Sequence, residues 1–329
     1  MGVFLSESVC GWREAARSYR ASANNTRSSF AHCAGAQFRR RLTVKLFRVR
    51  DDNDATPRET LSMRLTASLL CLMATGAAVR AEPQAPSLAS HGALYLLRMA
   101  DATGTKAPAT AEGMISYHFS ADCDFYAQTL RQAIDMQPQE GRRQVSESRV
   151  STYEDGRGQD FRFATNETGS RGEEVEGRAQ RSNGALAIAL SAPRPQKIST
   201  DGAVLFPTQH VARLIEAAER GEKILLARVF DGSADGRKIF NVTAVIGAAR
   251  NIVDGDPAAN APQLRGLKRW PVSLAYFPES VRDGLPDYTL SYDLYENGVS
   301  TNLRLDYGDY ALVGALTRIE FPAQAHCRK

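Results

Sequence analysis

Residues 288–307 read YTLSYDLYENGVSTNLRLDY, and this stretch predicts a β-hairpin. Apolar and polar residues alternate on both sides of Asn297-Gly298, the dipeptide favoured in two-residue type I′ turns, which would pair Glu296 with Val299. Counting outward from that turn matches apolar with apolar and polar with polar residues: Tyr292 faces Leu303, Leu290 faces Leu305, Tyr288 faces Tyr307, Ser291 faces Arg304 and Asp293 faces Asn302. A slip of one residue would exchange the two faces, so the pattern specifies both the register and one buried face.

Similar patterns occur along much of the chain upstream of this hairpin. Apolar runs or alternations predict strands at residues 88–99, 113–119, 145–153, 161–163, 185–190, 224–230 and 238–246. Turn-forming residues recur about every ten positions between these runs. This organisation favours an all-β sandwich or barrel. Three prolines punctuate residues 254–271, which we expect to form an irregular surface segment.

One segment has a helical pattern. After Phe206-Pro207, apolar residues recur with the spacing i, i+3, i+4 and i+7 at Val211, Leu214, Ile215 and Ala218. We expect Thr208 to cap the start of this helix and Gly221 to end it. A single amphipathic helix among many strands is expected to pack against the sheet or to plug the mouth of a barrel.

A short apolar stretch at residues 63–81 reads MRLTASLLCLMATGAAVRA. Arg64 precedes the apolar run, and the small residues Val79 and Ala81 occupy the −3 and −1 positions of a cleavage site before Glu82. This layout predicts a signal peptide that is cleaved between Ala81 and Glu82. An uncleaved anchor helix is the alternative, although the run is shorter than the roughly 20 apolar residues that span a bilayer.

The segment before this stretch, residues 1–62, has no sustained apolar period and contains Arg39-Arg40-Arg41. We interpret it as a disordered leader or as the product of a mis-assigned start, with translation beginning at Met63; a transit peptide is the alternative. Residues 82–329 are expected to form a single periplasmic β domain without an integral membrane span after processing.

The formal net charge of the whole chain is +4, and the leader supplies it. Residues 82–329 carry 28 Lys and Arg against 31 Asp and Glu, a formal charge of −3 with the two signs interspersed. Basic character therefore gives no support for binding nucleic acid.

Two cysteines, Cys123 and Cys327, remain after the predicted cleavage. An even number in an oxidising compartment predicts one disulfide, with two unpaired thiols as the alternative. Neither cysteine lies in a Cys-x-x-Cys spacing, and no His-x-x-x-His spacing is present, so the sequence predicts no metal site.

Catalytic motifs are absent from the sequence: we find no phosphate loop, zinc-protease motif, nucleophile elbow or dinucleotide fingerprint. Asp231 to Asp235 resembles the start of a calcium loop, but position 12 is Val242, so a hairpin turn is the better interpretation. The histidines His91, His118, His210 and His326 have no spacing that singles out a catalytic partner. We therefore predict no catalytic residue and no cofactor.

The chain resembles the EipB-type cell-envelope integrity proteins of alphaproteobacteria. The similar stretches, in order, are LASHGALYLLRM, GMISYHFSADCDFY, TYEDGRGQDFRF, LFPTQH, RVFDGSADGRKIF and YDLYENGVS, followed by the closing cysteine. The resemblance implies a periplasmic protein built on a long antiparallel sheet curled into a broken barrel or β-spiral. It also implies a structural disulfide between Cys123 and Cys327, and a role in maintaining the envelope with no assigned enzymatic activity.

Two functions are compatible with these features of the sequence. The first is non-enzymatic binding of an envelope lipid, a lipoprotein or a periplasmic protein, on a concave face lined by Leu, Ile, Phe and Tyr. The second is a periplasmic hydrolase acting on an envelope polymer, which would need a nucleophile or a pair of carboxylates brought together by the fold. A polar cleft with a buried histidine–carboxylate contact would favour it.

The disulfide can be tested directly. It would close a loop of about 200 residues, worth on the order of 5 kcal/mol by loop entropy, as an upper figure. We expect Cys327→Ser to lower the free energy of unfolding by a few kcal/mol, and non-reducing peptide mapping of exported protein to recover Cys123 linked to Cys327. Two freely alkylatable thiols in native protein would contradict the prediction.

Overall fold

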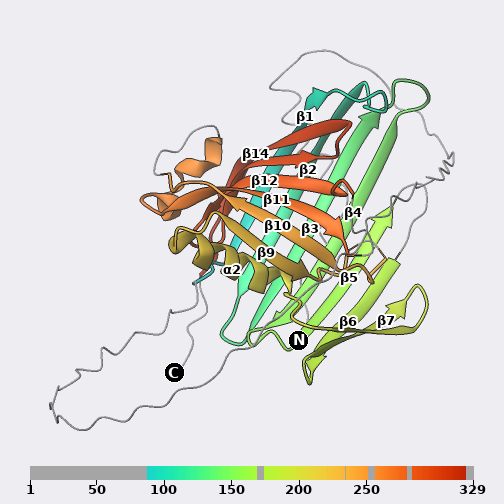
Figure 1. The fold of residues 1–329 in the computed structure, drawn as a ribbon. Helices are drawn as coiled ribbons and strands as arrows, with labels where there is room; N and C mark the ends of the chain where they lie inside the picture. Colours follow the sequence, from blue (N-terminus) through green and yellow to red (C-terminus); the bar gives the residue numbers. More distant parts are fainter. Residues whose placement is uncertain (1–86, 169–173, 234, 251–255, 280–283, 324–329) are drawn as a thin grey trace, which may run out of the picture. The chain divides into compact units, whose positions relative to one another are not determined.

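The computed structural model describes residues 87–168, 174–233, 235–250, 256–279 and 284–323. All of them lie in one compact unit, Arg41–Lys329. Within these residues the chain forms 14 strands, all in one antiparallel sheet, and one α-helix (Figure 1). The expectation of a mainly β protein with a single amphipathic helix is confirmed.

The first eight strands follow one another along one half of the sheet. They are β1 (His91–Ala102), β2 (Thr110–Ala121), β3 (Phe125–Gln137), β4 (Gln144–Asp155), β5 (Asp160–Thr168), β6 (Glu174–Ser182), β7 (Ala185–Ala192) and β8 (Gln196–Asp201). Helix α2 (Pro207–Glu219) follows, and then the second half of the sheet. Its strands are β9 (Ile224–Val229), β10 (Phe240–Ile246), β11 (Arg269–Pro278), β12 (Tyr288–Tyr295), β13 (Ser300–Asp306) and β14 (Tyr310–Glu320).

The two halves join where the first strand pairs with the last. The order across the sheet is β8-β7-β6-β5-β4-β3-β2-β1-β14-β13-β12-β11-β10-β9, so β8 and β9 are the edges. These edges are not paired along their length, but Arg228 of β9 donates to the Asp201 carbonyl (2.6 Å) and to Thr200 Oγ1 (3.0 Å) of β8. Leu205 adds a parallel bridge to Val229. The sheet is therefore a curled, incompletely closed barrel, as the family resemblance implied.

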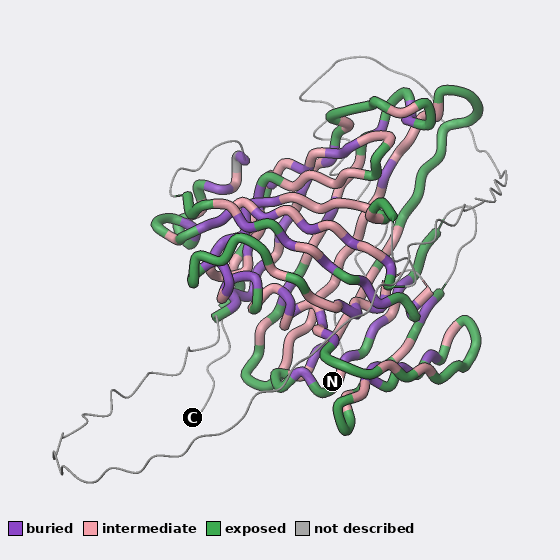
Figure 2. Tube along the Cα trace, in the orientation of Figure 1, coloured by how far each residue is buried: buried purple, intermediate pink, exposed green. Residues whose placement is uncertain are grey.

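The largest core cluster lies between helix α2 and the curled sheet. Leu214 and Ile215 of the helix are fully buried against β10 and β11, and Phe119 of β2 belongs to the same cluster. Since β2 and β11 are not neighbours in the sheet, this contact shows that the sheet curls over the helix. Figure 2 shows the buried residues along the strands and the helix and the exposed ones mainly at the hairpin turns.

The helix begins earlier than the sequence predicts. Its N-cap is Phe206 and Pro207 is the first helical residue, because proline suits a position whose N–H would have no helical partner. The expectation that Thr208 is the N-cap is wrong. Thr208 is the second helical residue, and its N–H donates to Glu154, a carboxylate of β4.

The end of the helix agrees with the sequence. Gly221 has φ +76°, a conformation that glycine adopts without strain. The N–H of Gly221 donates to the Ala218 carbonyl (3.0 Å) and that of Glu222 to the Ala217 carbonyl (2.9 Å). These two bonds form a Schellman motif, so the prediction that Gly221 ends the helix is confirmed.

The β12–β13 hairpin agrees with the prediction in its outer part only. Leu290 pairs with Leu305 and Ser291 with Arg304, as expected, but Asp293 faces Thr301 rather than Asn302. The loop has three residues instead of two, because the Tyr295 N–H donates to the Val299 carbonyl (2.9 Å). Gly298, at φ +86°, ends this loop in the geometry typical of three-residue hairpins.

A bulge at Asn302 restores the predicted register beyond the loop. Asn302 has φ +54°, its backbone N–H donates to Asp256 Oδ2 (2.7 Å), and its Nδ2 donates to Asp293 Oδ2 (2.9 Å). Asp293 also pairs with Arg269 of β11 at 3.3 Å, and both side chains are buried. The bulge is thus anchored by a buried charged network.

The segment that we expected to be an irregular surface excursion is part of this arrangement. Of residues 254–271, the first two lie outside the described residues. The rest contains the 3₁₀ turns Pro257–Asn260 and Pro262–Leu264, with Ala259 and Leu264 buried. Its last residues, from Arg269 on, already belong to β11. Most of the described residues before β11 are exposed or partly exposed, so the expectation of an irregular surface segment holds up to residue 268, with Ala259 and Leu264 anchoring its turns.

Replacing Asn302 tests the bulge. Asn302→Ala removes the hydrogen bond to the Asp293 carboxylate. It also puts at positive φ a residue whose side chain, unlike that of asparagine, cannot hydrogen-bond locally. We expect the two effects together to lower the free energy of unfolding by about 3 kcal/mol. Asn302→Gly loses the same bond but tolerates the backbone conformation, so we expect about 2 kcal/mol. Urea unfolding of both variants provides the measurement, and equal losses would show that the positive φ contributes nothing.

Candidate binding site

The inward face of the curled sheet carries aromatic and aliphatic side chains from both halves. Along β1 the buried residues alternate, so the inward face is defined by His91, Ala93, Tyr95 and Leu97. Inward residues that remain partly exposed come from β2, β3, β12 and β13 and pack against the largest core cluster: Tyr117, Tyr126, Tyr288, Leu290 and Leu303. Tyr117 and Leu303 also contact the cluster between β1, β2, β3 and β14, so the apolar surface is continuous.

Rings on this face pack in ordered pairs. Tyr276 and Tyr288 stack with ring centroids 4.5 Å apart, and Phe240 meets Tyr276 edge to face at 5.7 Å. In the other half of the sheet, Phe119 stacks with Tyr126 at 5.9 Å. Such pairs add about 0.5–1.5 kcal/mol each beyond their burial. They hold the rings in fixed positions on the inward face.

Three tyrosine hydroxyls on this face make no hydrogen bond with a described residue: those of Tyr276, Tyr288 and Tyr292. Tyr276 and Tyr292 are less than a tenth exposed, and burial raises the pKa of all three phenols above the usual value of 10. These hydroxyls are therefore protonated donors at physiological pH. These oxygens are not among the fully buried polar atoms that lack a partner, so they stay accessible, and an acceptor on a ligand would gain about 0.5–1.5 kcal/mol for each hydrogen bond it formed with them.

A buried carboxylate holds the start of helix α2 beside this face. Glu154 of β4 is 2% exposed, and its two oxygens accept the N–H groups of Thr208 (2.9 Å) and Gln209 (3.2 Å). Desolvation raises the pKa of Glu154 to about 7, although these hydrogen bonds and the nearby Arg181 oppose the shift. The carboxylate supplies, from another strand, the cap that the sequence pattern assigns to Thr208.

Further hydrogen bonds connect this cap to the tyrosines. Gln128 of β3 donates to Thr208 Oγ1 (3.1 Å) and accepts from the hydroxyl of Tyr117 (3.1 Å). On the other side, Arg181 of β6 donates to Gln209 Oε1 (2.8 Å) and lies 4.6 Å from the ring of Phe206. Sequence reasoning missed this network, whose members are far apart in the chain. Two of the family-like stretches, TYEDGRGQDFRF and LFPTQH, contain its central residues.

The described histidines do not form a catalytic centre. His91 is buried with its Nδ1 2.7 Å from the Ala89 carbonyl, and burial lowers its pKa. His210 is buried as well, and burial lowers its pKa to about 4. Within the described ranges none of His91, His118 and His210 forms an ion pair or hydrogen bond with a carboxylate, whereas His326 lies outside them.

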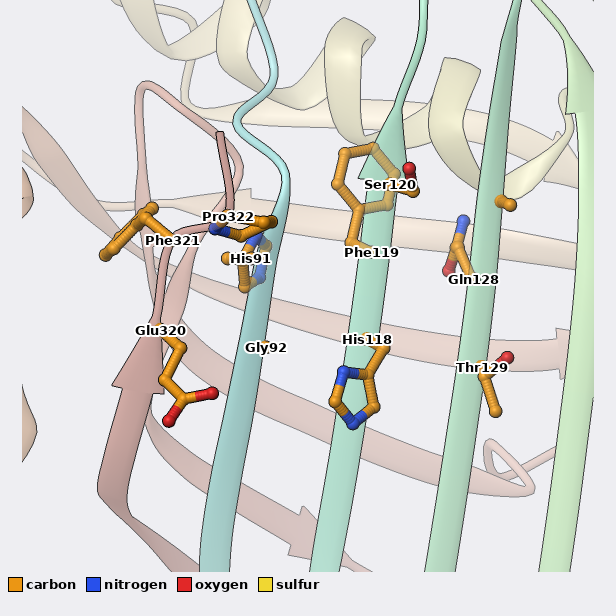
Figure 3. Close-up of a pocket in the computed structure, with 11 residues that line it drawn as sticks. His91, Gly92, His118, Phe119, Ser120, Gln128, Thr129, Glu320, Phe321 and Pro322 are labelled. Atoms are coloured by element: carbon orange, nitrogen blue, oxygen red, sulfur yellow. The ribbon is translucent and has the colours of Figure 1, made fainter. Parts of the chain in front are cut away.

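A shallow depression of about 490 Å³ lies on the outward face (Figure 3). Exposed His118 of β2 and Glu320 of β14 lie on either side of Gly92, which forms its floor. A second depression of about 550 Å³ lies near the seam and is lined by residues such as Arg181 and Val204. Neither brings a described histidine into hydrogen-bond contact with a carboxylate, so the inward tyrosine-lined face is the better candidate.

Of the other predicted site residues, some lie among the residues that the structure describes and some do not. Cys123 lies in the turn between β2 and β3, but Cys327, Ala81 and Glu82 lie outside the described residues, so the disulfide and the cleavage site stay predictions. Asp231 accepts the Ser233 N–H (2.9 Å) in the connection of the β9–β10 hairpin. The hairpin interpretation is thereby confirmed.

Two other kinds of feature are absent from the described part of the chain. No three His, Cys, Asp or Glu residues of the described segments are grouped as a metal site would require. No helix among these residues is long and apolar enough to cross a membrane.

The fold and the site define a class: a β protein whose single sheet curls, without closing, around one helix and an aromatic interior. Residues 82–322 match the EipB-like family, and the chain belongs to that family. A relative described as cell envelope integrity protein EipB, from Brucella abortus strain 2308, is 31% identical over 238 residues, covering 71% of this chain and 84% of the relative.

A solved structure agrees with the fold. It is the crystal structure of a β-barrel-like protein of a domain of unknown function, also from Brucella abortus. It superposes with a TM-score of 0.68 at 29% sequence identity, covering 73% of this chain and all of the other. The family assignment made from the sequence is thus confirmed.

The pKa of Glu154 predicts how stability depends on pH. Folding raises this pKa from an ordinary 4.5 to about 7, so between these values the folded state binds the proton more tightly. Glu154 therefore lowers stability as pH rises from about 4.5 to about 7, by about 3 kcal/mol in total, with no further change above that range. Glu154→Gln, which does not titrate, should flatten the dependence by this amount and add a constant loss from one missing acceptor.

Urea unfolding at pH 5 and pH 8 measures this difference. Glu167, an exposed carboxylate of β5, provides the matched control, because Glu167→Gln should leave the difference between the two pH values unchanged. A pH dependence as steep in Glu154→Gln as in the wild type would contradict the assignment.

Proposed function

We propose that this protein maintains the cell envelope from the periplasm, without enzymatic activity, by binding an envelope lipid, a lipoprotein or a periplasmic protein on its inward face. Membership of the EipB-like family and similarity to a relative described as a cell envelope integrity protein support an envelope role. The signal-peptide pattern at residues 63–81 supports export.

The observation that carries the binding proposal is the pairing of apolar surface with accessible hydroxyl donors that have no hydrogen-bond partner among the described residues. Leu290 and Leu303 offer apolar contact on the inward face, and the tyrosine hydroxyls beside them offer hydrogen-bond donors. An amphipathic ligand, with acyl chains or apolar side chains next to ester or carbonyl oxygens, has the complementary chemistry. The histidine–carboxylate contact that would favour the hydrolase alternative is made by none of the three described histidines.

Leu290→Lys tests the proposal by placing a charge on the inward face. The neighbouring variant Thr289→Lys is the matched control, since residue 289 points to the opposite face and pairs with Asp306, which a lysine suits. We expect the amount of lipid or protein that co-purifies with exported Leu290→Lys, measured by mass spectrometry, to be at least tenfold lower than with the wild type. We also expect it to fail to restore detergent resistance to cells that lack the gene.

Thr289→Lys should retain both properties. Circular dichroism and export levels show whether Leu290→Lys still folds. If the folded Leu290→Lys variant keeps both its co-purifying ligand and its complementation, the inward face is not the binding site.

A further inference from the structure

The edge strand β9 carries an exposed apolar patch on the outward side of the sheet. Ile224 and Leu226 are 61% and 72% exposed, and Val245, which lies opposite Ile224 on β10, is 54% exposed. The other exposed large apolar residues of the described chain, Val145, Leu285 and Tyr307, lie in three separate places. The outward apolar surface is therefore concentrated at this edge.

The backbone at the same positions is also unpaired. The Leu205 N–H donates to the Arg228 carbonyl (2.7 Å), and the Phe230 N–H donates to the Leu205 carbonyl (2.9 Å). Even-numbered residues of β9 thus direct their N–H and C=O groups away from β10, toward the free edge. Ile224 and Leu226 share this orientation, and no hydrogen bond from these groups to a described residue is formed.

Edges of this kind are normally protected. Natural sheets place lysine, proline, a bulge or a covering segment on an edge strand, because unpaired backbone next to apolar side chains pairs with other chains. Here Leu205 covers the end of the edge at Arg228 and Phe230, but the sequence Ile224-Leu225-Leu226 has none of these protective features. Leu205 also shows that extended backbone fits against this edge.

We propose that the free edge of β9 binds an extended peptide segment of a partner protein, with apolar side chains at alternate positions, by β-strand addition. Such a strand would continue the pairing that Leu205 begins and would cover Ile224 and Leu226. Lys223, exposed at the start of the free edge and without an ion-pair partner among the described residues, favours a segment with an acidic residue at that end.

Other occupants fit less well. The free edge from Ile224 to Leu226 spans about 10 Å at about 3.3 Å per residue, which is too short for this edge alone to bury the roughly 800 Å² per partner of a stable dimer interface. A lipid surface would leave the backbone groups of both residues unsatisfied. This edge lies on the opposite side of the sheet from the tyrosine-lined face, so the present proposal and the proposed function can fail independently.

Amide hydrogen exchange of the mature chain with a capped peptide, Asp-Val-Thr-Val-Thr-Val, tests the proposal. At saturating peptide we expect exchange at the Ile224 and Leu226 amides to slow at least tenfold. The Leu225 and Ala227 amides, which face β10, serve as internal controls and should not change. Unchanged exchange at Ile224 and Leu226 over millimolar peptide would overturn the proposal.

Two variants separate strand addition from simple apolar contact. Leu226→Pro removes an N–H from the free edge, whereas Val245→Lys charges the same patch one strand away. We expect at least tenfold weaker peptide binding for Leu226→Pro and less than threefold for Val245→Lys. Because proline can disturb the strand, Leu226→Lys, which keeps the N–H, is the second variant and should weaken binding at least threefold.

Three results would count against the proposal: equal losses in Leu226→Pro and Val245→Lys, protection of the two amides by phosphatidylcholine vesicles, or their protection by self-association without peptide.

Discussion

The architecture depends on the pairing of β1 with β14. This ladder runs over most of both strands and places the two ends of the domain at the centre of the sheet. It follows that the free edges are β8 and β9, which are consecutive along the chain and separated only by the segment that contains α2. The helix thus lies on the connection between the two edges, and its buried face packs inside the curl of the sheet. The seam left beside it is held by Arg228 and by the single bridge of Leu205.

The interior combines apolar packing with a few polar groups whose positions are fixed. Glu154 is expensive to bury as a charge, but two helix N–H groups that have no helical partner offset part of that penalty. The same carboxylate is linked through Thr208 and Gln128 to the hydroxyl of Tyr117. The start of the helix and the inward face are consequently connected by three hydrogen bonds.

Local patterns predicted the elements better than their assembly. All seven predicted strand segments overlap observed strands, because a strand with one buried face has apolar and polar residues alternating along its sequence. Strands such as β3 were missed because nearly all of its residues are only partly buried and no alternation results. The bulge at Asn302 was not predictable, since its positive φ depends on Asp256 and Asp293, which the hairpin pattern does not reveal. Of the tyrosines of the candidate site, Tyr117, Tyr288 and Tyr292 belonged to predicted strands, whereas Tyr126 and Tyr276 lie in β3 and β11, which were not predicted. Only the curl of the sheet, which the family resemblance implied, brings β11 and β12 over β2 and β3.

The β1–β14 ladder also determines when the domain can fold. Thr317 and the Leu94 carbonyl, which it contacts, are 223 residues apart in the sequence. A chain is made from its N-terminus, so β1 emerges long before the strand that covers its second edge, and the first meander must wait with that edge open. Folding of such high contact order is slow, and an open strand edge invites association with other chains. Until β14 has been synthesised, the open edge of β1 therefore needs protection from pairing with other chains.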